Sequence, residues 1–417
     1  MRRFPTECVS PDNARPQDGC GAVHAYREPN AMSVSESGGR TTRAAMTDGL
    51  EKAPSVYPAA HLMRETVWGE EALYASALKC FKGVGRKFST QTYKLHLISN
   101  TVKLAREHRR GKYKASPPRV VQIEYPKKRT ALSIAFRDRV TQRSINDLAL
   151  YPQAVRRFVW TNFACQKGKG TDAAREYMKA MLRRAFLVYG SNDFKIVEVD
   201  AKGYYDNMRH DVTDAMFAKF LDPWTAAEVK KTLDRQYRGE TGYNPGSQMV
   251  QIAGISYLDA LDHHMKEVAR RKMYVRYMDD MRIPARDGAD VAHVLGEVCA
   301  MLAKVGLAAH PVKTRSVSAA RGTVFLGFLF SVTPSGRVLV TREPKAVKAN
   351  RRRLRRLAGK IRRGGAQPEA LDESWSCMRS CMAKGRNRSL LRRMDDFVNS
   401  LKEEIHAETQ YQTDRAA

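Results

Sequence analysis

The chain has 417 residues, more than one typical domain needs. Hydrophobic residues make up 43% of it, which is enough for a packed core and excludes a wholly disordered chain. The formal net charge of +29 at pH 7 favours a phosphate-rich partner over ordinary solubility. Charge alone leaves a basic, solvated surface open as the alternative.

Cysteine usage and hydropathy indicate the compartment. The seven cysteines lack the even count and regular spacing of a disulfide framework, which favours a reducing environment. No apolar stretch is long enough to span a bilayer, and the N-terminal residues lack the apolar core of a signal peptide. We therefore expect a cytoplasmic protein with no membrane partner.

The first part of the chain changes character at about residue 56. Residues 1–55 are rich in Pro, Gly, Ser, Thr and Arg without sustained apolar periodicity, which predicts a disordered N-terminal tail. From about 60 to 112 the apolar spacing is helical. Residues 120–125 then predict a strand that enters a basic turn at 126–129.

The middle of the chain predicts alternating strands and helices. A β-prone run at 194–199 ends at Asp200, and helical spacing follows over 212–220. Apolar residues from 255 to 268 predict one long helix. Strands flank Asp279 and Asp280, a helix follows over 291–302, and strand patterns return at 324–330 and 338–340.

Basic residues dominate the C-terminal part from Arg342 onward. Between residues 341 and 365 eleven Lys or Arg stand against one acid, Glu343, beside a narrow apolar stripe. This pattern predicts a basic amphipathic helix that suits a nucleic-acid groove, with a membrane surface as the alternative. The fold class predicted for the whole chain is α+β, with a sheet-based centre between an N-terminal lobe and a helical C-terminal lobe.

Two acidic positions carry the candidate chemistry. Asp200 and the pair Asp279-Asp280 stand where predicted strands end or reverse, with apolar residues on both sides. Carboxylates held on neighbouring strands can share two hard divalent cations, which prefer oxygen ligands and support phosphoryl transfer. Taken alone, Asp279-Asp280 also fits an ordinary hairpin turn.

Several motifs in collinear order resemble those of reverse transcriptases. Residues 277–280, Tyr-Met-Asp-Asp, resemble the Tyr-x-Asp-Asp box, and residues 199–210 resemble the first palm motif of bacterial retron, group II intron and diversity-generating enzymes. Residues 246–251 and 257–263 resemble the Gly-rich motif and its following helix. Val250 departs from the expected Ser, which puts a hydroxyl role there in doubt but not the role of Gln251.

Further motifs extend this resemblance over roughly residues 95–400. Lys313-Thr314 matches the Lys-Thr element, and 325–328 matches the primer-gripping hairpin. Residues 137–140 and 165–171 resemble fingers motifs, while 384–387 resemble a helical tail. The resemblance implies a right-hand polymerase, with an antiparallel palm sheet packed on helices. Its implied parts are an N-terminal extension and fingers at 56–185, a palm with the catalytic core at 186–332, and a basic helical thumb and C-terminal tail at 333–417.

The resemblance implies an RNA-directed DNA polymerase that adds deoxynucleotides to a primer 3′-hydroxyl. Its cofactor is expected to be Mg²⁺, as two ions, with Mn²⁺ as a substitute. Asp200 and Asp279 are expected to ligate both ions, with the Ala201 carbonyl completing one shell and Asp280 nearby. Lys313 is expected to protonate the leaving pyrophosphate or hold the triphosphate, and a solvated lysine is the alternative.

The resemblance also implies roles in binding substrate and nucleic acid. Tyr205 is expected to lie under the sugar and exclude a 2′-hydroxyl, and Gln251 to contact the templating pair; an ordinary core aromatic is the alternative for Tyr205. The candidate triphosphate clamps, for which a plain basic face is an equal alternative, are Lys128, Arg129 and Arg137. The candidate nucleic-acid contacts are Lys167, Lys169, Gly327, Arg352, Arg355 and Arg356.

The expected partners are an RNA template, a DNA or RNA primer, deoxynucleoside triphosphates and a co-encoded structured RNA. Two other functions stay open: an RNA-templated RNA polymerase, which an aromatic at Tyr205 disfavours, and a non-catalytic RNA-binding or maturation scaffold. The sequence after the implied thumb contains no paired Cys-x-x-Cys and no His-Asn-His cluster, which disfavours a mobile intron. A role in phage defence or a retron-like element is the preferred expectation.

Overall fold

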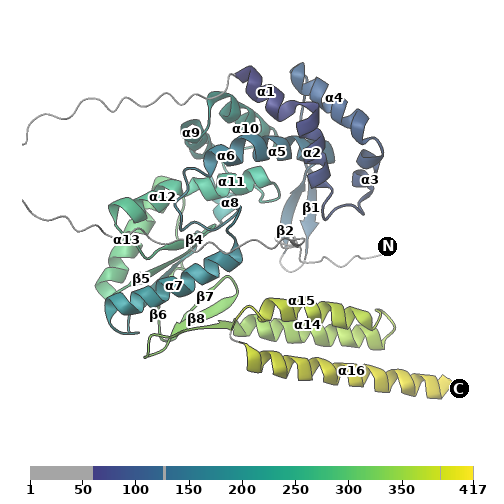
Figure 1. Ribbon diagram of the computed structural model, residues 1–417, viewed down its shortest axis with the longest axis vertical. Coiled ribbons are helices and arrows are strands. Elements are labelled where there is room, and N and C mark those ends of the chain that lie inside the picture. Colours follow the sequence, from purple (N-terminus) through teal and green to yellow (C-terminus); the bar gives the residue numbers. More distant parts are fainter. Residues whose placement is uncertain (1–59, 125–127, 386, 417) are drawn as a thin grey trace, which may run out of the picture.

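The computed structural model describes residues 60–124, 128–385 and 387–416. Figure 1 shows an N-terminal helical lobe, a middle part built on β-strands, and long helices that extend from it at the C-terminal end. The predicted disordered tail at 1–55 lies outside the described residues. The mixture of helices with antiparallel sheets confirms the predicted α+β class.

The N-terminal lobe is helical, as its periodicity predicted. A two-stranded antiparallel hairpin stands beside it, and the turn of this hairpin, predicted as basic, lies mostly outside the described residues. The elements of this lobe are α1 (Ala60–Trp68), α2 (Glu70–Cys80), α3 (Phe88–Leu95), α4 (Leu97–Arg109), β1 (Arg119–Ile123), β2 (Arg129–Ser133), α5 (Phe136–Ile145), the π-helical η1 (Asn146–Leu150) and α6 (Tyr151–Ala154).

A four-stranded antiparallel sheet in the order β4-β5-β3-β6 forms the centre. Backbone hydrogen bonds also join its edge strand β4 to the loop at 161–163. Its strands are β3 (Lys195–Val199), β4 (Val275–Tyr277), β5 (Asp280–Ala285) and β6 (Arg315–Ser318). The predicted strand before Asp200 and the predicted strands around the acidic turn are confirmed.

Each face of this sheet packs on its own set of helices. Side chains alternate along β3, so Val197 and Val199 join the core formed with α11 (Gln248–Tyr257) and α13 (Gly288–Lys304). Ile196 points the other way, into the core formed with α7 (Thr171–Tyr189). The sheet is therefore buried on both faces, and its strand ends are held rigidly.

A second, three-stranded sheet lies against α7 on that same side. Its strands are β7 (Thr323–Phe325), β8 (Phe328–Val332) and β9 (Val338–Arg342). The strand signals over 324–330 correspond to two strands, β7 and β8, joined by the hairpin expected at 325–328, where the chain reverses at Leu326 and Gly327 with positive φ (47° and 78°). Left-handed backbone at two successive residues gives a tight turn and ends the strand.

The prediction of one long helix over 255–268 is wrong. The chain forms α11, breaks at Leu258 with φ −103° and ψ 17°, and continues as α12 (Asp259–His263) and the π-helical η2 (His264–Val268). A π turn adds one residue, so it shifts the apolar stripe around the helix axis. Val268, the last residue of that apolar pattern, is consequently 69% exposed.

Three helices of the middle part begin at a residue whose side chain caps the first turn. Asp222, Ser247 and Asp287 each accept a hydrogen bond from a backbone N–H three residues later, at the first turns of α10 (Pro223–Gln236), α11 and α13. The two remaining helices of this part are α8 (Tyr204–Asn207) and α9 (His210–Phe220). The helix predicted over 212–220 is confirmed.

The C-terminal helices form a bundle with its own core. This core includes Leu354, Trp375 and Val398, one from each of α14 (Pro344–Arg362), α15 (Glu369–Met382) and α16 (Arg388–Ala416). The side-chain oxygen of Asn387 accepts a hydrogen bond from the N–H of Arg342 at 2.9 Å, which ties the bundle to β9. The predicted basic amphipathic helix is confirmed as α14.

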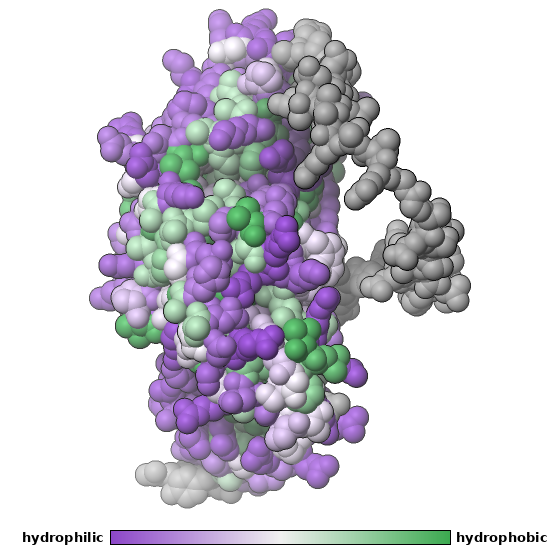
Figure 2. All heavy atoms as spheres, turned by 90° about the vertical axis from the view of Figure 1, so that its left-hand side faces the viewer, coloured by the Kyte–Doolittle hydropathy of each residue, from purple (hydrophilic) through white to green (hydrophobic). Residues whose placement is uncertain are grey.

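Hydrophilic side chains cover most of the face in Figure 2, and apolar side chains gather there in small patches between them. Across the described part of the chain, no helix combines the length and the apolar character that crossing a membrane requires.

A fully buried ion pair joins the central sheet to the helices behind it. Arg276 on β4 and Asp262 on α12 both have fully buried side chains. The Arg276 guanidinium donates to both carboxylate oxygens, at 2.7 and 2.5 Å, and to the carbonyl of Ile255 at 2.8 Å. Tyr274 donates its hydroxyl proton to the same carboxylate at 2.6 Å. Because water cannot replace these partners, each group depends on the other.

We therefore expect Asp262→Ala to lower the free energy of unfolding by about 3–5 kcal/mol, since it leaves a buried guanidinium and a buried hydroxyl unpaired. Urea unfolding followed by circular dichroism measures this loss. Asp234→Ala is the matched control, because Asp234 forms its ion pair with Lys230 at the surface of α10. Its effect should stay within about 1 kcal/mol, and equal losses in the two variants would contradict the role given to the pair.

Candidate active site

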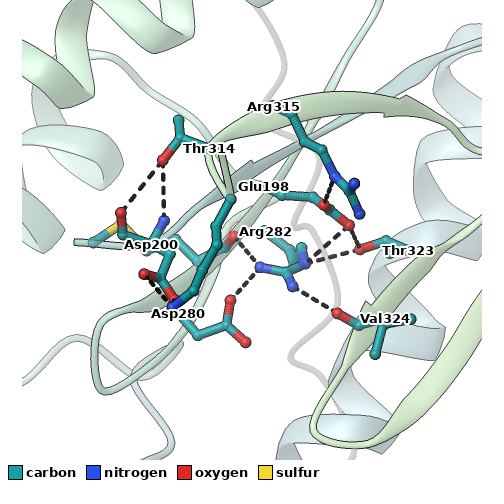
Figure 3. Close-up of polar contacts among 10 residues, drawn as sticks. Glu198, Asp200, Asp280, Arg282, Thr314, Arg315, Thr323 and Val324 are labelled. Atoms are coloured by element: carbon teal, nitrogen blue, oxygen red, sulfur yellow. Dashed lines mark hydrogen bonds and ion pairs between the residues drawn. The ribbon is translucent and has the colours of Figure 1, made fainter. Parts of the chain in front are cut away.

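Three carboxylates meet at one end of the central sheet. Asp200 follows β3, while Asp279 and Asp280 form the turn from β4 into β5. β3 and β5 are hydrogen-bonded neighbours, with Val199 opposite Met281, so the strand end and the turn adjoin. Figure 3 shows Asp200 and Asp280 approaching each other from these two segments. The structure therefore brings together the acidic residues that the sequence singled out.

The turn that carries Asp279 has a strained backbone. Met278 has φ 58°, a left-handed conformation that costs a side-chain-bearing residue about 1 kcal/mol. Arg276 donates a hydrogen bond to the Met278 carbonyl at 2.7 Å and so fixes this conformation. Burial raises the pKa of Asp279, and the negative charge of Asp200 raises it further. The fixed backbone thus keeps the Asp279 carboxylate close to the negative charge of Asp200.

A lysine neutralises Asp200 from the opposite side. Lys313 Nζ lies 2.9 and 3.0 Å from the two carboxylate oxygens of Asp200. The segment that carries it is fixed by backbone hydrogen bonds, from His310 N–H to the Asp200 carbonyl at 2.7 Å and from Thr314 N–H to the His310 carbonyl at 2.9 Å. The predicted association of Lys313 with the acidic site is present in the structure.

Arg282 is the positively charged partner of Asp280. Figure 3 shows its guanidinium between Asp280, Glu198 and Thr323. It forms an ion pair with Asp280 and donates to the Thr323 hydroxyl at 2.8 Å and to the Val324 carbonyl at 2.6 Å. Even so, burial raises the pKa of Asp280 to about 6.

The second carboxylate at Arg282 belongs to Glu198, which lies directly opposite it in the strand register. Glu198 also accepts a hydrogen bond from Thr323 at 2.5 Å and from the side chain of Arg315 at 2.7 Å. This network joins the central sheet to β7 beneath the carboxylates.

The carboxylates fit a divalent cation in part. Among the described residues, no group of three or more His, Cys, Asp or Glu is arranged to hold a metal ion by itself. Asp200 and Asp279 remain as a pair, and Mg²⁺ is commonly bound by one or two carboxylates together with substrate phosphates. Burial, and to a smaller extent the charge of Asp200, raises the pKa of Asp279, and a bound cation would offset both effects. Asp280 forms an ion pair with Arg282, and the backbone of Ala201 forms an antiparallel bridge with Ala309.

Tyr205 and Gln251 lie beside the acidic turn. The half-buried Tyr205 has its pKa raised by burial and, to a smaller extent, by the charges of Cys165 and Asp279, which places it close to both residues. Gln251 is in the first turns of α11, and its side-chain oxygen lies 3.9 Å from the sulfur of Cys165. The structure therefore places Tyr205 near Asp279 and Gln251 near Cys165, which is itself close to Tyr205.

The predicted basic clamps are placed differently. Arg137 is paired with Glu107 at 2.5 Å and lies over the Tyr113 ring, so it contributes to packing in the N-terminal lobe. Lys128 is exposed beside the β1–β2 hairpin, and Arg129 begins β2. The structure brings neither the Arg137 nor the Lys128 side chain into contact with the carboxylates.

The two fingers lysines also have local partners. Lys169 donates to the carbonyls of Trp160 and Asn162 at 2.9 and 3.0 Å, and burial lowers its pKa. Lys167 lies over the Tyr151 ring. Lys169 thus fastens the loop that covers the edge of β4.

The remaining candidates lie on the second sheet and the C-terminal bundle. Gly327 forms the tip of the β7–β8 hairpin, where an added Cβ would lie 3.0 Å from the Arg342 guanidinium. Arg352 and Arg356 are exposed on α14, whereas Arg355 stacks on the Phe397 ring at 5.1 Å.

Sequence reasoning missed the polar residues that support the site. Glu198 and Arg282 are charged residues inside otherwise apolar strands, and Arg276 stands one residue before the Tyr-x-Asp-Asp box. A charge in a buried strand requires a partner, so these positions carried a usable signal. Which residue pairs with which depends on the strand register, and the sequence alone does not predict that register.

We expect Arg282→Met to lower the free energy of unfolding by about 3 kcal/mol in the absence of divalent ions, because half-buried Asp280 loses its counter-charge. The folded-state pKa of Asp280, about 6, lies above its ordinary 3.8, so this group makes the protein less stable as pH rises from about 4 to 6. Removing Arg282 raises that pKa further, and the loss should therefore be larger at pH 8 than at pH 5.

Urea unfolding at the two pH values tests this expectation. Arg379→Met, which breaks an exposed ion pair with Asp395, is the control and should show a small loss that does not differ between pH 5 and 8. An equal loss for Arg282→Met at both pH values would show that Asp280 is not the group that Arg282 neutralises.

Comparison with known families agrees with this geometry. Residues 134–330 match the family model described as "Reverse transcriptase (RNA-dependent DNA polymerase)". The matched segment spans the central sheet, its carboxylates, Tyr205, Gln251 and Lys313. A search of curated proteins finds no match to the chain. The match indicates that residues 134–330 form a reverse transcriptase domain, and it indicates RNA-directed DNA polymerase activity, a nucleotidyltransferase reaction for which this family uses an RNA template, a primer and deoxynucleoside triphosphates.

Proposed function

We propose that the chain copies RNA into DNA by phosphoryl transfer supported by two divalent metal ions, with Asp200 and Asp279 as their shared ligands. The observation that carries this proposal is the pair of carboxylates held together by β3 and the β4–β5 turn. The raised pKa of Asp279 supports it, because a cation bound there would offset both the burial of this carboxylate and its repulsion by Asp200. Two bound Mg²⁺ ions, or Mn²⁺ in their place, would activate the primer hydroxyl and neutralise charge on the transferring phosphoryl group.

The chain's own residues would orient the reactants. Arg276 holds the turn that carries Asp279, and Arg282 keeps Asp280 charged behind it. Lys313 is bonded to Asp200 in the structure and is 57% exposed at its side chain. Asp200 would hold the cation, and the exposed ammonium of Lys313 beside it would hold the triphosphate or protonate the leaving pyrophosphate.

We further propose the right-hand arrangement, with fingers, palm and thumb in chain order. The central sheet and its carboxylates form the palm, the β7–β9 sheet adjoins the primer end, and the bundle of α14–α16 forms the thumb. Exposed Arg352 and Arg356 on α14 suit the phosphates of a template–primer duplex. A role in phage defence or a retron-like element, with a co-encoded structured RNA as template, is the biological setting we propose.

Asp279→Asn should abolish DNA synthesis and leave RNA binding within about threefold of wild type, because a neutral amide ligates hard cations poorly but changes little of the basic surface. Labelled dTTP incorporation on poly(rA) with an oligo(dT) primer and Mg²⁺ measures synthesis, and filter binding measures affinity. Should RNA binding fall as far as synthesis, the scaffold function would be favoured. Sequencing of the nucleic acids that co-purify with each protein then identifies the natural template.

Tyr205→Ala should raise ribonucleotide use relative to deoxynucleotide use by about tenfold or more, since the ring that excludes the 2′-hydroxyl is removed. The measurement is the ratio of kcat/KM for UTP to that for dTTP on the same primer–template. Tyr243→Phe is the control: Tyr243 is a buried aromatic whose backbone N–H bonds to the Tyr205 carbonyl, and its ring packs against His210. An unchanged ratio in Tyr205→Ala would remove the gate assignment and reopen the RNA polymerase alternative.

A further inference from the structure

Both tyrosines of the first palm motif meet helix α11 at one residue, Gly254. The Tyr204 hydroxyl donates a hydrogen bond to the Gly254 carbonyl. The Tyr205 ring lies over the Gly254 Cα, where an added Cβ would come within 2.8 Å of the Tyr205 hydroxyl oxygen and 3.1 Å of Cε1 and Cζ. Contacts this short are not tolerated without movement. The missing side chain of Gly254 is therefore the space that the Tyr205 ring occupies.

The backbone gives no other reason for a glycine here. Gly254 lies inside α11, where its φ is ordinary, and it is buried. A glycine inside a helix costs about 1 kcal/mol relative to alanine. In this structure its effect is to let the aromatic ring approach the helix closely.

The Tyr205 ring cannot retreat elsewhere if that space is filled. Its backbone carbonyl accepts a hydrogen bond from Tyr243 N–H at 2.8 Å, which fixes the Cα position. Among the described residues, its buried hydroxyl has no hydrogen-bond partner, so packing alone holds it in place.

We infer that Gly254 is a specificity-determining residue, because it sets the depth of the Tyr205 ring and thereby the room for the sugar of the incoming nucleotide. The inference rests on the proposed role of Tyr205 at the sugar. A deeper ring leaves space for a deoxyribose, and a ring pushed outward obstructs the sugar itself. Gly254 touches neither the metal ligands nor the phosphates, so its effect is on nucleotide binding.

The hydroxyl oxygen makes the shortest of the three contacts, which provides an internal test. Tyr205→Phe removes the atom at 2.8 Å and leaves the two ring carbons at 3.1 Å, which need to move by only a few tenths of an ångström. The Tyr205→Phe variant should therefore accept Gly254→Ala. The wild-type tyrosine should not.

The experiment compares wild type, Gly254→Ala, Tyr205→Phe and the double variant in the poly(rA)·oligo(dT) assay. Gly254→Ala should raise KM for dTTP about tenfold with a smaller change in kcat, and should lower UTP use further. In the Tyr205→Phe background the same substitution should change KM by no more than about twofold. Gly296→Ala is the matched control, since Gly296 also lies inside a helix, α13, but has no atom within 4 Å of its added Cβ.

Urea unfolding of the four proteins reads the packing independently of activity. Gly254→Ala should destabilise the wild-type background more than the Tyr205→Phe background. An equal rise of KM in both backgrounds would overturn the inference, because the hydroxyl would then not be what Gly254 accommodates. Coupling in stability without any change in KM would overturn it too, while leaving the Asp279→Asn result and the polymerase assignment untouched.

Discussion

The buried ion pair between Arg276 and Asp262 is the constraint on which the rest of the site depends. One guanidinium bonds to α12 through Asp262, to α11 through the Ile255 carbonyl, and to the catalytic turn through the Met278 carbonyl. It therefore fixes the strained backbone before Asp279 to the helices α11 and α12. A strained backbone persists only where several surrounding contacts hold it in place, and the hydrogen bonds of Arg276 provide these contacts.

A second arginine completes an electrostatic balance around the carboxylates. Arg282 lies beneath Asp280, and Lys313 lies across Asp200, so positive charge stands on two sides of the cluster. Without it, three neighbouring carboxylates would repel one another and open the strand ends. The arrangement is preorganised: the charges that hold the acids in place are part of the fold before any substrate binds.

The sequence allowed the acidic centre to be predicted because its signals are local. Strand periodicity ends at Asp200, the Tyr-x-Asp-Asp box lies in a hairpin, and the charge of α14 is written in consecutive residues. The break at Leu258 and the π turn after it carry no local signal, so the helix prediction failed there. The sequence also did not predict which residues contact each other across the fold. Glu198 meets Arg282 only through strand register, and Gly254 meets Tyr205 only through the packing of α8 on α11.

The basic residues divide into two groups with different physical tasks. Arg137 and Lys169 are committed to partners within the N-terminal lobe and the loop over β4, where their charge holds the fold together. Arg352 and Arg356 on α14 are exposed, where charge attracts phosphates and releases counterions. The exposed basic side chains of α14 and the carboxylates around Asp279 therefore lie in different parts of the chain. Under the proposed function, the loss of one carboxylate would stop synthesis without changing the basic surface that we propose to hold the template.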